Sequence, residues 1–151
     1  MLKRIRNIAK ENERIIFVLL GDIVNGFRER TTEDIQRFYK KADSFLDTIN
    51  NGLKEKSVEF YFTPGNHDLD GNSLESFNEF IKRHSRINDS PYAFTLNESV
   101  FTFDIDDFRF ILVDSNLSRD YNARGQIDGK LLKFKGVTEK QIVLFMHHPP
   151  Y

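Results

Sequence analysis

The sequence of 151 residues predicts an α/β fold in which parallel strands and helices alternate. Three apolar runs of strand length carry this prediction, and each run ends in a cluster of polar residues. The runs cover residues 15–20, 58–62 and 142–146. The first two are separated by a segment with helical spacing, which is the pattern of a βαβ unit.

The helix of this unit is predicted over residues 31–52. Thr31 or Thr32 can cap its start, with Asp34 close behind, and Asn51-Gly52 ends it. Apolar residues recur along it at helical spacing, namely Ile35, Phe38, Tyr39, Ala42, Phe45, Leu46 and Ile49. A crossover of this kind places its two strands parallel in one sheet. The residues that follow positions 20 and 62 are therefore expected at the same edge.

The remaining segments predict further helices and an antiparallel hairpin. Helices are expected at 2–13, near 73–85 and over 127–135, and strands at 92–96, 100–105 and 108–113. Asp106-Asp107 forms the short turn between the last two strands. Because no repeat, low-complexity tract or long linker interrupts the chain, we expect one domain over residues 1–151.

Composition excludes several classes of function. The net charge is −1, from 22 basic and 23 acidic residues, so nucleic acid and anionic membranes are not indicated as partners. Cysteine is absent, which excludes disulfides, thiolate metal sites and a cysteine nucleophile. The apolar run behind the basic start is too short for a signal sequence or a membrane span. We therefore expect a cytoplasmic protein, of undetermined oligomeric state.

Polar clusters follow each of the three apolar runs directly. They are Gly21-Asp22, the Gly-Asn-His-Asp segment 65–68, and the His-His-Pro-Pro segment 147–150. The carboxyl ends of parallel strands form the site in α/β sheets, so these clusters are expected to converge. Carboxylate, amide and imidazole groups at one place make a metal-ligand set with a spare histidine.

These three clusters, in this order and each after a strand, resemble the calcineurin-like metallophosphoesterase superfamily. The resemblance covers nearly the whole chain and includes three of the five sequence blocks of that family. The opening Asp-x-His block and the closing Gly-His-x-His block are absent from the sequence. The chain is therefore expected to be a single partial domain, 1–151, of a metallophosphoesterase-type α/β/β/α sandwich with mixed sheets, incomplete at both ends.

The resemblance also implies roles for individual residues. Asp22, Asn66 and His147 are expected to be metal ligands, with the Asp22 carboxylate bridging two ions. His67, beside a ligand without being one, is expected to be the general acid, and Asp68 to orient it. Whether His148 takes part stays open.

The implied function is metal-dependent hydrolysis of a phosphoric ester, by a phosphatase or a phosphodiesterase that uses a metal-bridged hydroxide. The complete domain would hold two divalent metal ions, and Mn, Fe and Zn all suit this ligand set. Arginines in the loops 26–30 and 117–124 are candidate phosphate contacts. The alternative is a non-catalytic remnant or a binding module on the same fold.

Two other patterns are explained more simply. The segment 68–79 nearly fits a calcium-binding loop, but Ser73 stands where the sharp turn calls for glycine, and a strand precedes the segment instead of a helix. His84 is a lone histidine on a helix face and is expected to be structural.

Overall fold

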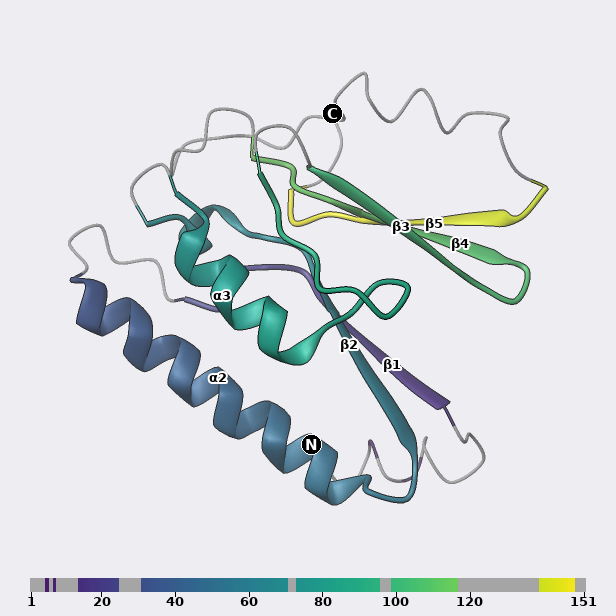
Figure 1. The fold of residues 1–151 in the computed structure, drawn as a ribbon, viewed down its shortest axis with the longest axis horizontal. Coiled ribbons are helices and arrows are strands. Elements are labelled where there is room, and N and C mark those ends of the chain that lie inside the picture. The colour runs from purple at the N-terminus through teal and green to yellow at the C-terminus, as the bar shows by residue number, and fades with distance from the viewer. Residues whose placement is uncertain are drawn as a thin grey trace.

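The computed structural model describes residues 5, 7, 14–24, 31–70, 73–95, 99–116 and 139–148. Within these ranges the chain forms two β-sheets accompanied by helices (Figure 1). No helix of the described part is long and apolar enough to cross a membrane.

The first sheet is the predicted βαβ unit. It consists of β1 (Arg14–Leu19), α2 (Thr32–Gly52) and β2 (Ser57–Phe62). The two strands pair in parallel along their full length, with Phe17 opposite Phe60. The predicted parallel arrangement in one sheet is thus confirmed, and both strands end at the same edge.

Of the two predicted cap residues, Thr31 is the one that caps helix α2. The Thr31 hydroxyl accepts from the Asp34 amide at 3.2 Å, and the Asp34 carboxylate accepts in return from the Thr31 amide at 3.2 Å. This reciprocal capping box satisfies two amides that an uncapped helix would leave without partners. The residues that α2 buries are Ile35, Tyr39, Leu46 and Ile49, all of which belong to the predicted apolar face.

The second sheet has mixed pairing. After the short 3-10 helix η1 (Asn66–Asp68) and the helix α3 (Glu75–His84), the chain forms β3 (Val100–Ile105), β4 (Phe108–Val113) and β5 (Gln141–Phe145). Strand β3 pairs antiparallel with β4, and β4 pairs in parallel with β5. The hairpin prediction is confirmed, and the α/β fold with mixed sheets is the architecture observed.

One strand prediction is wrong. The described residues of 92–96, which are 92–95, form no strand. The backbone of Phe94 is instead bonded by a side chain, because Asn78 donates to the Phe94 carbonyl and accepts from its amide, each at 2.9 Å. The alternating apolar pattern at 92–95 is therefore present although these described residues form no strand. The predicted helix 127–135 lies outside the described residues, as does most of the helix 2–13.

The layers are held together by aromatic side chains on alternate faces of β2. Helices α2 and α3 lie on one side of β1 and β2, and the second sheet lies on the other (Figure 1). Phe62 meets Phe80 of α3 edge-on, with ring centroids 5.3 Å apart, whereas Tyr61 stacks on Phe103 of β3 at 3.9 Å. The abundance of aromatic residues is therefore explained by a core on both faces of the first sheet.

Candidate metal centre

Two glycines allow the loops after β1 and β2 to touch through their backbones. Gly21 has φ +82°, and a Cβ placed on it would lie 2.2 Å from the Gly65 nitrogen. A Cβ on Gly65 would lie 2.2 Å from Oδ1 of Asp22. Asp22 itself has φ +53°, so two successive residues of the loop after β1 have positive φ. This contact brings Asp22 against the segment 65–68.

We expect Gly21→Ala to disrupt this contact. Its Cβ would meet backbone atoms, which cannot rotate away, in a conformation that L-residues rarely adopt. The free energy of unfolding should fall by at least about 2 kcal/mol in chemical denaturation. Gly52→Ala, at the end of α2 and outside the left-handed region, is the control and should not lower stability. An unchanged midpoint for Gly21→Ala would contradict the close approach of the two loops.

The Asp22 carboxylate lies between a backbone amide and a histidine ring. Its Oδ1 accepts from the His67 amide at 3.1 Å, and its Oδ2 lies 3.4 Å from Nε2 of His147. Asn66 precedes His67 in the same loop and is half-buried. The structure thus brings together the ends of β1, β2 and β5, although β5 belongs to the other sheet.

The ring of His147 is oriented by its second nitrogen. Nδ1 lies 2.6 Å from the carbonyl oxygen of Leu20 and must donate, because a carbonyl only accepts. Nε2 therefore faces the Asp22 carboxylate. In neutral imidazole this nitrogen is an acceptor, so the two facing atoms attract each other only with a proton or a cation between them. An Nδ1–H bonded to a backbone carbonyl is also how metal-binding histidines are usually held.

The geometry fits a divalent cation. Two ligands about 2.1 Å from one tetrahedral ion lie roughly 3.4 Å apart. Among the described residues, no group of three or more His, Cys, Asp and Glu side chains has metal-binding geometry. A third ligand must therefore come from another type of side chain or from outside the described ranges. The amide oxygen of Asn66, in the loop that contacts Asp22, is of the right chemical type.

Asp68 is buried and bonds the loop after β1 and the loop after β2. Its side chain is 1% exposed, and its two oxygens accept from the amides of Gly65 at 2.9 Å and Val24 at 3.2 Å. Burial raises the pKa of Asp68 to about 6, the Asp22 charge adds to this rise, and the backbone hydrogen bonds oppose it. These bonds tie the loop after β1 to the loop after β2. Orientation of His67 by Asp68 stays a prediction.

The end of β4 contributes residues that the sequence did not single out. Asp114, Ser115 and Asn116 are buried, with exposed fractions of 8%, 1% and 8%. Nδ2 of Asn116 donates to the Gly65 carbonyl at 3.4 Å, and the Ser115 hydroxyl contacts Nδ1 of His148 at 3.0 Å. The sequence carries a signal for them, since these polar residues directly follow an apolar strand, as Asp22 and His147 do.

His148 is half-buried beside His147. Their rings meet edge-on, with centroids 4.7 Å apart. Burial lowers the pKa of His148, the neighbouring His147 lowers it further, and Asp22 opposes the shift. The candidate arginines 28, 30, 119 and 124 and the two prolines of the segment 147–150 lie outside the described residues.

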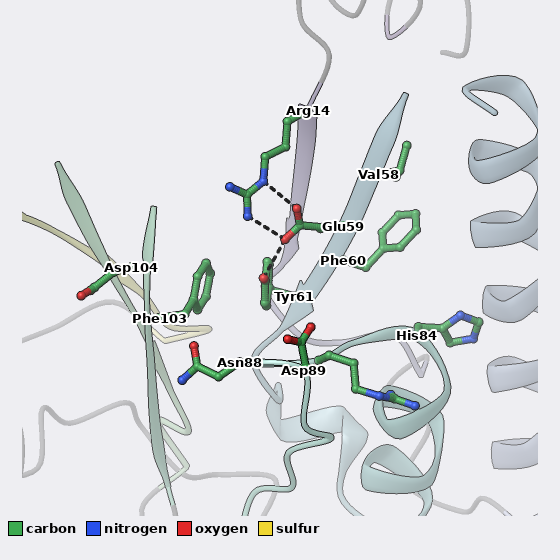
Figure 2. Close-up of a pocket in the computed structure, with 11 residues that line it drawn as sticks. Arg14, Val58, Glu59, Phe60, Tyr61, His84, Asn88, Asp89, Phe103 and Asp104 are labelled. Carbon is green, nitrogen blue, oxygen red and sulfur yellow. Dashed lines mark hydrogen bonds and ion pairs between the residues drawn. The ribbon is translucent and has the colours of Figure 1, made fainter. Parts of the chain in front are cut away.

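A separate cavity lies between β2 and β3, away from these strand ends (Figure 2). Its volume is about 420 Å³, and its wall includes a bidentate ion pair in which Arg14 binds Glu59 at 2.6 and 3.1 Å. The Tyr61 hydroxyl donates to the same carboxylate at 2.9 Å. Arg14 lowers the pKa of Glu59, and burial together with this bond raises the pKa of Tyr61. The side chains of Arg14, Glu59 and Tyr61 thus bond one another, and none of the residues that line this cavity belongs to the loops that carry Asp22, Asn66 and His147.

His84 has the structural role that the sequence predicts. Its Nε2 lies 2.6 Å from Oδ1 of Asp43 on α2, and its ring packs against Phe80. Arg83 binds the same carboxylate, so the pair of residues links α3 to α2.

Comparison with known proteins identifies the class of this chain. It matches the calcineurin-like phosphoesterases over residues 1–151, and it belongs to that family. The family comprises phosphoester hydrolases, which generally bind divalent metals. The chain is also 27% identical, over 154 aligned positions, to a probable glycerophosphodiester phosphodiesterase GpdQ of Arcobacter nitrofigilis. The match covers 97% of this chain and 45% of that relative, so the chain spans less than half of its length.

Proposed function

We propose that Asp22, Asn66 and His147 hold a divalent metal ion and that the chain takes part in metal-dependent hydrolysis of phosphoric esters. The approach of Asp22 Oδ2 to His147 Nε2 carries this proposal, with Nδ1 of His147 fixed on the Leu20 carbonyl. Two acceptor atoms held 3.4 Å apart suit a cation between them. We propose two such ions, of Mn, Fe or Zn, for which Asp22 would be a ligand.

Residues of the chain would position the metal ligands and supply a proton. Bound divalent metal supplies Lewis-acid charge and a nucleophile that is active at neutral pH. The His67 amide holds the Asp22 carboxylate in place, and the Leu20 carbonyl holds the ring of His147. The imidazole of His67 then donates a proton to the departing alkoxide oxygen, and Asp68 keeps its loop against the loop of Asp22.

A phosphodiester is the substrate class that we propose, because the relative from Arcobacter nitrofigilis is named a probable glycerophosphodiester phosphodiesterase. The near-zero net charge fits a small ester better than a nucleic-acid polyanion.

Hydrolysis of bis(p-nitrophenyl) phosphate by the purified chain tests the proposal. We expect release of p-nitrophenolate with added Mn²⁺, its loss with EDTA, and its return when Mn²⁺ is restored in excess. The monoester p-nitrophenyl phosphate, assayed in parallel, should turn over more slowly if diesters are the substrate. Binding of Mn²⁺ without hydrolysis of either ester would contradict the enzymatic proposal and favour a metal-binding module on the same fold.

A further inference from the structure

Ser115 lies in a buried polar segment at the end of β4 that the proposed reaction does not use. A buried hydroxyl is costly unless it is hydrogen-bonded, and this side chain is 1% exposed. All of its described bonds go to one residue, because Oγ accepts from the His148 amide at 3.0 Å and contacts His148 Nδ1 at 3.0 Å. The residue that these bonds hold follows His147 directly.

The bond to the ring has a defined direction. Among the described residues, the Ser115 hydroxyl has no acceptor other than Nδ1 of His148. If Nδ1 carried the proton, the hydroxyl hydrogen would be buried without a partner. The hydroxyl therefore donates to Nδ1, and in the neutral ring the proton lies on Nε2.

Asn116, which follows Ser115, contacts the loop after β2. Asn116 donates to the carbonyl of Gly65, the residue before Asn66, and both its amide and its Nδ2 donate to Oδ1 of Asp114, at 3.0 and 2.9 Å. Two successive residues at the end of β4 thus contact the loop after β2 and the loop after β5. These loops carry two of the three proposed metal ligands.

We propose that Ser115 is a positioning residue of the metal centre, which fixes the backbone and the ring tautomer of His148 and thereby the direction of His147. Its effect on metal affinity rests on the proposed function, whereas its effect on the His148 tautomer does not. Replacing a residue that orients a metal ligand typically lowers metal affinity or activity by about 10- to 100-fold.

The tautomer is measured by long-range ¹H–¹⁵N correlation spectra of the metal-free chain at about pH 8, where imidazole is ordinarily neutral. The His148 signals are assigned by their loss in His148→Gln. We expect an unprotonated Nδ1 and a protonated Nε2 in the parent, and a shift toward a mixture of tautomers in Ser115→Ala. A protonated Nδ1 in the parent would overturn the inference, even if the variant failed to fold.

Metal affinity is then compared by calorimetric titration with Mn²⁺. Ser115→Ala should bind the ion about 10- to 100-fold more weakly than the parent. Ser85→Ala is the matched control, because Ser85 is 3% exposed and bonds Tyr92 away from the centre. Equal affinity for Ser115→Ala and the parent would overturn the inference. A parent that bound no Mn²⁺ would contradict the proposed function alone, since the spectra decide the tautomer without metal.

Discussion

Replacing Asp22 with asparagine should abolish metal binding and phosphoester hydrolysis together. The Asp22 carboxylate contacts both the His67 amide and the ring of His147. Asparagine keeps an oxygen for the amide but removes the negative charge that holds a cation. We expect Mn²⁺ affinity, measured by calorimetry, to fall by at least about 100-fold. Replacing a residue that only orients a metal ligand already lowers affinity by about 10- to 100-fold.

The fold should survive this change. Asp22 has φ +53°, a conformation that asparagine tolerates as well as aspartate does. Asp47→Asn, on the exposed face of α2, is the matched control and should leave both Mn²⁺ affinity and hydrolysis unchanged. An Asp22→Asn variant that bound Mn²⁺ as tightly as the parent would contradict the assignment of Asp22 as a ligand.

His67→Ala should separate chemistry from metal binding. The contact of His67 with Asp22 runs through its backbone amide, which alanine retains. Metal content should therefore stay near the parent level, while turnover falls by roughly 10² to 10⁴, the usual range for a lost general acid. The loss should be smaller for p-nitrophenyl esters, because nitrophenolate departs without a proton, and larger for alkyl esters.

The control for His67→Ala is His84→Ala. This change removes a histidine that binds Asp43 between the helices, so stability should fall without a loss of turnover per folded molecule. If His67→Ala strips the metal, His67 is a ligand. If it leaves hydrolysis of an alkyl ester unchanged, His67 has no role in the reaction.

Local patterns in the sequence predicted most elements of the fold. The limits of β3 and β4 agree with the prediction, and those of β1 and β5 differ by one residue at each end. Helical spacing and a cap at Thr31 or Thr32 placed α2 correctly, and Thr31 is the cap observed. Periodicity reports which face of an element is buried but not what covers it. The segment 92–95 has the alternating pattern of a strand, yet the amide and carbonyl of its Phe94 are bonded by the side chain of Asn78.

Pairing between distant strands was less predictable. The sequence of 142–146 does not indicate which strand β5 pairs with. In the structure β5 pairs with β4 and does not extend the sheet of β1 and β2. The candidate centre consequently lies where the ends of two sheets meet. The polar ends of the strands still predicted that Asp22 and His147 would converge, and their side chains approach within 3.4 Å.

Residues that act through the backbone could not be assigned from the sequence. The role of Asp68 in orienting His67 stays a prediction, but its bonds to the amides of Gly65 and Val24 could not be assigned from the sequence. Ser115 and Asn116 contact His148 and Gly65, which are distant in the chain. Such contacts depend on how loops meet in space. Sequence patterns suggest only that a polar strand end lies near a site.

A crystal of the chain soaked with Zn²⁺ and measured at the zinc absorption edge tests the central claim most directly. We expect an anomalous peak about 2.0 to 2.2 Å from Oδ2 of Asp22, the amide oxygen of Asn66 and Nε2 of His147. The ring of His147 should keep its bond from Nδ1 to the Leu20 carbonyl. Absence of a peak between Asp22 and His147, in a crystal that takes up zinc elsewhere, would contradict the proposed metal centre.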